Sequence, residues 1–151
     1  MPLTENDYYA RGCTALLDAV GKTIQRVINI KRNAAYRTKA DKVIFVITTD
    51  GMENASIEYS YAMIQSMIEI QRERYGWEFL FLGANIDAVS EASRMGIRAD
   101  RAVRFNNDMQ GIKTNYEALE KTVCMMRSVE DTTQIGDEWK TDIEDDYRRR
   151  K

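Results

Sequence analysis

The stretch 43-VIFVITTDGMEN-54 begins with an unbroken apolar run, Val43 to Ile47, that stops abruptly at two threonines and an aspartate. The run is short, rich in β-branched residues and apolar at every position. This pattern is typical of a strand that is buried on both faces of a parallel sheet. Parallel strands need crossover connections, usually helices, so the stretch predicts an α/β protein in which strands and helices alternate.

The rest of the sequence follows that alternation. Apolar residues recur at helical spacing in several segments, and two further continuous apolar runs mark strands. The predicted helices cover residues 14–32, 56–76, 87–96, 109–129 and 137–149, and the further strands cover 77–85 and 101–106. We therefore expect a three-layer open parallel sheet with helices on both faces, forming a single domain over residues 1–151.

The predicted helices over 14–32, 56–76, 109–129 and 137–149 each have an apolar face, which we expect to be buried. In the helix over 109–129, this face consists of Ile112, Tyr116, Leu119, Val123 and Met126. In the helix over 56–76, it consists of Ile57, Tyr61, Ile64 and Ile68.

The composition limits the chemistry available to the chain. The sequence contains no histidine, and its two cysteines, Cys13 and Cys124, have no paired spacing. The commonest general base and ordinary zinc sites are therefore absent, so a metal here would be a hard cation with oxygen ligands, such as Mg²⁺ or Mn²⁺.

The net charge of −2 gives no electrostatic case for nucleic acid as the main partner. No apolar run is long enough to span a membrane or to form a signal peptide, so we expect a cytoplasmic protein.

Two polar segments are candidates for a ligand site. Asp50 and Gly51 come directly after the buried strand, at the end where open α/β sheets bind their ligands. Asp50 is either a metal ligand or a turn residue, because Asp-Gly is also common turn chemistry. Thr14 follows Gly12 at the start of a predicted helix, where its hydroxyl either coordinates a hard cation or caps the helix.

Four other polar residues are more simply explained as helix-terminal residues. Asn54 and Ser56 precede a predicted helix and favour a capping role there. Asp87 is the expected N-cap of the helix that follows it, and Asp18 lies in a first helical turn, where it complements the helix dipole.

The combination of 12-GCTALLDAVG-21 and 43-VIFVITTDGMENAS-56 resembles the von Willebrand factor A (vWA) domain, in particular bacterial and phage-type stand-alone members. The run 77-WEFLFLGANIDA-88 is similar to the same subgroup. In that family a metal-ion-dependent adhesion site holds Mg²⁺ or Mn²⁺, and a partner protein typically completes the coordination with a carboxylate. The resemblance implies that Thr14 and Asp50 are metal ligands in a binding site without catalytic activity. The accessory positions beside them are Gly12, Gly51, Asn54 and Asp87.

The sequence departs from the vWA pattern because it contains no D-x-S-x-S motif, which supplies the first metal ligands in the family. The chain corresponds to the second half to two-thirds of a family domain, as though the first strands were absent. Thr14 and Asp50 offer two oxygens against the roughly six of a Mg²⁺ shell, so we expect weak or no metal binding by this chain alone.

The absent strand would lie beside Val43–Ile47, so we also expect an open sheet edge there and a homo-oligomer formed through it.

The sequence therefore supports one leading function and two alternatives. The leading interpretation is a non-enzymatic protein-interaction module with an incomplete metal site. The first alternative is a Mg²⁺-dependent phosphoryl-transfer or hydrolytic enzyme, although the chain has no glycine-rich phosphate loop, no GxSxG elbow and no D-x-D motif. The second alternative is a structural half-domain whose sheet is completed by another chain.

Overall fold

The computed structural model describes residues 15–33 and 42–151. In chain order, the helices and strands are α1 (Leu16–Asn33), β1 (Ile44–Thr49), α2 (Tyr61–Tyr75), β2 (Glu78–Gly83), α3 (Ala88–Arg94), β3 (Ala102–Arg104), α4 (Met109–Ser128) and α5 (Thr141–Arg149). Short 3-10 helices precede β3 and α5. This order agrees with the predicted alternation, and within the described ranges no helix has the length and apolar character needed to cross a bilayer.

The three strands form one parallel sheet in the order β1-β2-β3. Ile44–Thr49 pair with Glu78–Gly83, and Phe81–Gly83 pair with Ala102–Arg104. The predicted parallel α/β architecture is thus confirmed. The prediction that Val43–Ile47 is fully buried is wrong, because β1 is an edge strand among the described residues and Val46 is 37% exposed.

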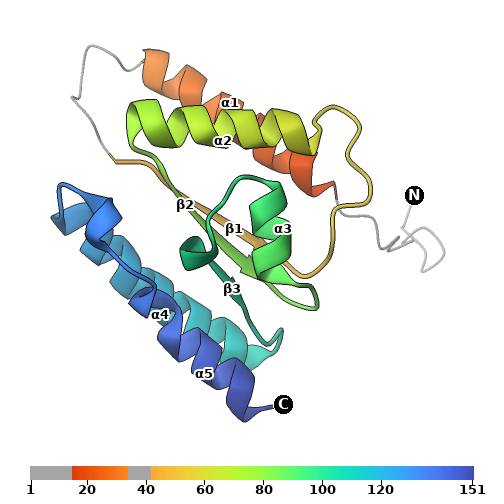
Figure 1. Ribbon diagram of the computed structural model, residues 1–151, viewed down its shortest axis with the longest axis vertical. Helices are drawn as coiled ribbons and strands as arrows, with labels where there is room; N and C mark the ends of the chain where they lie inside the picture. Colours follow the sequence, from red (N-terminus) through yellow and green to blue (C-terminus); the bar gives the residue numbers. More distant parts are fainter. Residues whose placement is uncertain (1–14, 34–41) are drawn as a thin grey trace, which may run out of the picture.

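Helices lie on both sides of the sheet: α1 and α2 on one side, α4 and α5 on the other (Figure 1). Two hydrophobic clusters fill the space between helices and strands. Successive side chains of a strand point to opposite faces, so β2 contributes to both clusters. Phe79 and Phe81 belong to the cluster with α1 and α2, whereas Leu80 and Leu82 belong to the cluster with α4 and α5.

Helix α2 begins later than the sequence predicted. Its N-cap is Ser60, whose hydroxyl accepts a hydrogen bond from the Met63 amide at 3.2 Å, so neither Asn54 nor Ser56 is its N-cap, contrary to the prediction. Ile57, which was expected on the inner helical face, precedes the helix and is 91% exposed. The predicted stop is correct, because Gly76 adopts the left-handed conformation with φ of 66°.

Helix α4 buries a face that agrees only in part with the one predicted: Met126 is buried as expected, whereas Ile112 and Tyr116 are not. Its buried residues are Gly111, Asn115, Ala118, Thr122 and Met126. A Cβ atom on Gly111 would lie 1.9 Å from the Asn106 carbonyl oxygen, so this small-residue face allows a close approach to the segment after β3. The first two residues of the predicted apolar face lie on the open side of the molecule, where Ile112 is 41% and Tyr116 is 71% exposed.

Candidate functional site

A cavity of about 660 Å³ opens at the carboxyl end of β1, the position predicted for a ligand site. Its walls come from the start of α1, the end of β1, the segment after β3 and the outer side of α4. The polar residues that line it are Thr48, Thr49, Asp50, Asn107 and Asn115. Its apolar wall includes Leu16, Phe105, Ile112, Tyr116 and Leu119. Its size falls within the usual range of ligand pockets.

Asn115 is the most unusual group in this cavity. The residue is 5% exposed, and its Oδ1 atom has no hydrogen-bond partner among the described residues. A buried polar atom without a partner costs about 1–3 kcal/mol of folding free energy. The oxygen is itself shielded from the surface, so this cost falls on the fold and does not by itself indicate an occupant of the cavity.

A second hollow continues from the first along the open edge of β1. It has a volume of about 430 Å³ and lies between α1 and the strand residues from Val43 to Thr48. Leu16, Ala19 and Thr48 line both hollows, so together they form one continuous depression. We call this depression the edge groove.

The backbone of β1 directs polar groups into the edge groove. The Glu78 amide donates to the Val43 carbonyl and the Ala84 amide donates to the Thr49 carbonyl, each at 2.9 Å. Backbone groups alternate in direction along a strand, so the odd-numbered residues of β1 bond to β2. The N–H and C=O groups of the intervening residues, Ile44, Val46 and Thr48, therefore point toward the groove and have no backbone partner among the described residues.

The loop between β1 and α2 is fixed to the first turn of α1. Glu53 Oε2 accepts a hydrogen bond from the Leu17 amide at 2.8 Å, and the Ser56 hydroxyl accepts one from the Asp18 amide at 2.9 Å. Ser56 thus helps to cap α1, a helix that precedes it in the chain. In return, the Asp18 carboxylate accepts backbone N–H groups from Ile57, Glu58 and Tyr59 at 2.9–3.0 Å. The loop that follows Asp50 is therefore held in place by two carboxylates.

These contacts also set the ionisation of both carboxylates. The backbone N–H of Ile57, helped by those of Tyr59 and Glu58, holds the pKa of Asp18 below its ordinary value against the opposing effect of burial. For Glu53, burial raises the pKa, but the N–H groups of Leu17 and Ser56 outweigh it and the net pKa is lowered. Both groups stay ionised at neutral pH and are occupied by the backbone, so neither is suited to act as a general acid.

The predicted site residues near Asp50 are only partly brought together. Thr14 and Gly12 lie outside the described residues. Asp50 is exposed, and no hydrogen bond or ion pair joins it to another residue in the described ranges. Gly51 is engaged by Thr49, whose hydroxyl donates to the Gly51 carbonyl at 2.9 Å.

The other two accessory positions lie apart from the cavity that Asp50 lines. Asn54 is exposed in the loop before α2. Asp87 is the N-cap of α3, as predicted, and accepts a hydrogen bond from the Ser90 amide at 3.2 Å. It lines a separate hollow beside Arg104 and Tyr147.

A magnesium site is not assembled by the part of the chain that the structure describes. Those residues contain no group of three or more His, Cys, Asp or Glu side chains that could hold a metal ion. Asp50 alone supplies one carboxylate, against the roughly six oxygen ligands of Mg²⁺. The described residues therefore do not fit the metal that the vWA resemblance implies.

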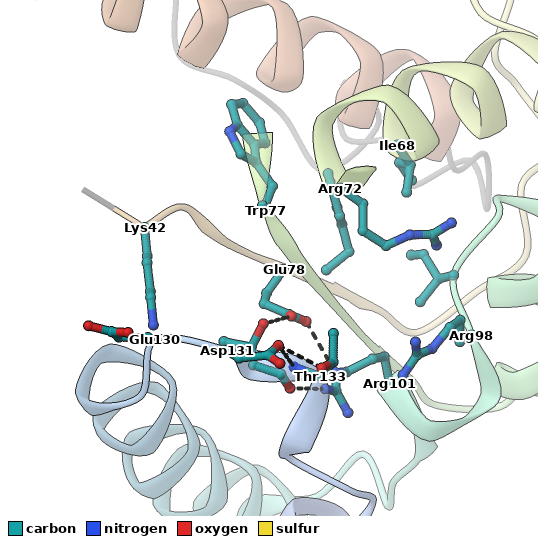
Figure 2. Close-up of a pocket in the computed structure, with 14 residues that line it drawn as sticks. Lys42, Ile68, Arg72, Trp77, Glu78, Arg98, Arg101, Glu130, Asp131 and Thr133 are labelled. Atoms are coloured by element: carbon teal, nitrogen blue, oxygen red, sulfur yellow. Dashed lines mark hydrogen bonds and ion pairs between the residues drawn. The ribbon is translucent and has the colours of Figure 1, made fainter. Parts of the chain in front are cut away.

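A smaller cavity of about 210 Å³ lies at the opposite end of the sheet, around the start of β2 (Figure 2). It is rich in charge, but its central residue, Arg101, is fully used by the fold. The five N–H groups of its guanidinium bond to carboxylates of Glu78 and Asp100 and to carbonyls of Thr132, Ile135 and Gly136. This cluster fixes the segment before α5 to β2 and leaves Arg101 no donor for a ligand.

The sequence did not single out Asn115, although one signal could have found it. It lies four residues after Gly111 and three before Ala118, so it belongs to a face of small residues in a long helix. Asparagine is a poor helix former in such an interior position. A small-residue face interrupted by an amide is therefore a place to expect a buried polar contact.

Comparison of the chain with models of protein families, with curated proteins and with solved structures gives no match.

Proposed function

We propose that this chain is a non-enzymatic protein-interaction module that binds an extended polypeptide segment along the open edge of β1. The observation that carries the proposal is the orientation of Ile44, Val46 and Thr48, whose backbone groups point into the edge groove. An added strand would pair with these groups, and the side chains around the groove would provide selectivity. A bare edge that is not covered in this way is a liability for a folded protein.

The exposed apolar residues around the groove support the same proposal. Val46 of β1 and Ile112 and Tyr116 of α4 all lie on this side of the molecule. The amphipathic pattern of α4 predicts burial for Ile112 and Tyr116, yet nothing in the described chain covers them. Apolar surface that is patterned for burial but left exposed is typical of an interaction site.

The arrangement is also compatible with the vWA resemblance. Asp50 follows β1, and β1 is joined through α2 to β2 in the parallel order that the resemblance implies. We propose a partial vWA-like, Rossmann-like three-layer fold whose adhesion site is incomplete, with Thr14 and Asp50 as its remaining ligands. The open edge then lies where the family would have a further strand.

The alternatives have less support. A Mg²⁺-dependent hydrolase needs clustered carboxylates, whereas Asp18 and Glu53 are bound to backbone N–H groups and the described residues contain no acidic cluster that could hold a metal ion. A half-domain completed by a different chain would use the same edge of β1. This half-domain alternative differs from a homo-oligomer only in the identity of the chain that pairs with β1. We propose that the pairing chain is a second copy of the same protein.

The proposal is tested by measuring the mass of the purified chain by light scattering over a dilution series. We expect a dimer or larger assembly at micromolar concentration, and a monomer when Val46→Lys places a charge on the open edge. Ile57→Lys adds the same charge at an exposed site in the loop before α2 and should associate like the wild type. A wild-type chain that is folded and strictly monomeric throughout the series would contradict the proposal.

A further inference from the structure

We infer that two copies of this chain pair their β1 strands antiparallel about a two-fold axis at Val46, so that Lys42 of each copy meets the partner's Asp50. The inference rests on the proposed function and adds to it the direction, the register and the charge pairs of the interface.

The backbone of β1 restricts the register. In an antiparallel ladder, two residues form a hydrogen-bonded pair when both direct their N–H and C=O groups toward each other. On the open edge these residues are Ile44, Val46 and Thr48. Registers that pair even-numbered with even-numbered residues are therefore allowed. One of them sets Val46 opposite the partner's Val46 and Ile44 opposite the partner's Thr48.

The charges at the ends of the strand select this register among those allowed. The segment 42-KVIFVITTD-50 carries a cation at one end and an anion at the other, and Val46 is its midpoint. Antiparallel pairing about Val46 places Lys42 directly opposite the partner's Asp50, and the two-fold symmetry repeats this pair at the other end. A shift by two residues would set Lys42 opposite the partner's Thr48 or Asp50 opposite the partner's Ile44, and the complementary charges would no longer face each other.

Both charged residues are exposed at the two ends of the strand. Lys42 donates one hydrogen bond, to the Met126 carbonyl at 2.9 Å, and its charge also acts on the carboxylate of Asp131 in the same chain. An ammonium group has three N–H donors, so two remain for a carboxylate. Asp50 is exposed, and its carboxylate has no hydrogen-bond or ion-pair partner among the described residues.

The same arrangement covers the apolar surface next to the groove. A two-fold axis perpendicular to the sheet would join two three-stranded sheets into one and keep both α4 helices on the same side. Ile112 and Tyr116 line the cavity at the end of β1, so they project toward the side from which the partner approaches. Val46, the exposed apolar residue of the strand, would lie at the centre of the interface.

The inference is tested by reversing the end charges and measuring the dimer dissociation constant by sedimentation equilibrium. Lys42→Glu and Asp50→Lys each set like charges opposite one another at both ends, so each should weaken the dimer about tenfold or more. The double variant restores opposite charges and should recover most of the affinity. Arg74→Glu, on the exposed side of α2, changes the net charge as Lys42→Glu does and should leave the dissociation constant unchanged.

Mixing the two single variants separates pairing from damage to the fold. Each single variant should be largely monomeric, whereas their equimolar mixture should form a heterodimer, because both end pairs are then opposite in charge. If both single variants dimerise like the wild type, the inferred register is wrong and the proposed function stands. If the wild type is monomeric, the inference and the proposed function both fail.

A covalent readout tests the axis independently of charge. In a background with both native cysteines changed to serine, Val46→Cys should form a disulfide-linked dimer on mild oxidation. The expected Cα separation of the central pair, about 5.5 Å, suits a disulfide. Ile57→Cys, far from the edge in the loop before α2, should not cross-link at the same rate. Equal rates for the two variants would overturn the inferred axis.

Discussion

Replacing Asn115 by leucine should stabilise the folded chain, although the residue is buried. The Asn115 Oδ1 atom has no hydrogen-bond partner in the described part of the chain, and leaving such an atom buried costs about 1–3 kcal/mol. Leucine has a similar shape and no polar atom, so it removes this cost with little change in packing. We expect the free energy of unfolding to rise by about 1–2 kcal/mol, and the melting temperature to rise by about 2–8 °C for a chain of this size.

Urea unfolding monitored by circular dichroism measures this change. The comparison is made in the Val46→Lys background, so that association does not contribute to the measured stability. Thr122→Val is the matched control, because Thr122 lies on the same buried face of α4 and its hydroxyl is satisfied by the Ala118 carbonyl at 2.6 Å. It should be neutral or destabilise by less than about 1.5 kcal/mol. If Asn115→Leu lowers the free energy of unfolding by as much as Thr122→Val does, the reasoning about the unpaired oxygen is refuted.

Three further predictions concern other parts of the chain. The folded state lowers the pKa values of Asp18 and Glu53. Their contribution to stability is therefore complete above the ordinary carboxylate pKa values near 4 and is lost as the pH falls through the lowered values. The midpoint of urea unfolding, measured between about pH 2 and 7, should decline on acidification, and it should decline less steeply in the double variant Asp18→Asn/Glu53→Gln. Gly111→Ala should destabilise by about 1–3 kcal/mol in urea unfolding, because its Cβ would overlap the Asn106 carbonyl, and an unchanged midpoint would contradict that close approach. Calorimetric titration with Mg²⁺ or Mn²⁺ should give weak or no binding, in the wild type and in Asp50→Ala alike; strong binding that the substitution abolishes would indicate an assembled metal site.

Local sequence signals predicted the order of the elements well. The continuous apolar runs gave β1 and β2, and Gly76 and Asp87 marked the end of α2 and the start of α3 correctly. These signals act over a few residues, so they do not depend on how the chain folds back on itself. The start of α2 was misplaced because both Ser56 and Ser60 can cap a helix, and Ser56 is drawn away by its bond to α1.

The features that failed depend on tertiary contacts. Periodicity identified the apolar stripe of α4, but it carried no information that Gly111 would bring the neighbouring face, which shares only Met126 with the stripe, against the segment after β3. Asp18 lies in the first turn of α1 as predicted, but the sequence did not reveal that its carboxylate also binds a loop about forty positions later in the sequence. Hydrophobicity alone predicted β1 as a central strand, because an edge strand that pairs with another chain has the same apolar composition. The open edge among the described residues agrees instead with the expectation drawn from the vWA resemblance.

The open edge of β1 is tested most directly by amide hydrogen exchange, read residue by residue by NMR over a range of protein concentrations. The amides of Phe45 and Ile47 bond within the sheet and should be protected at every concentration. The Val46 amide points into the edge groove, so its protection should be low in dilute protein and rise as the strand of another copy pairs with it. Rapid exchange at Val46 at all concentrations, with Phe45 and Ile47 protected throughout, would contradict strand pairing at this edge.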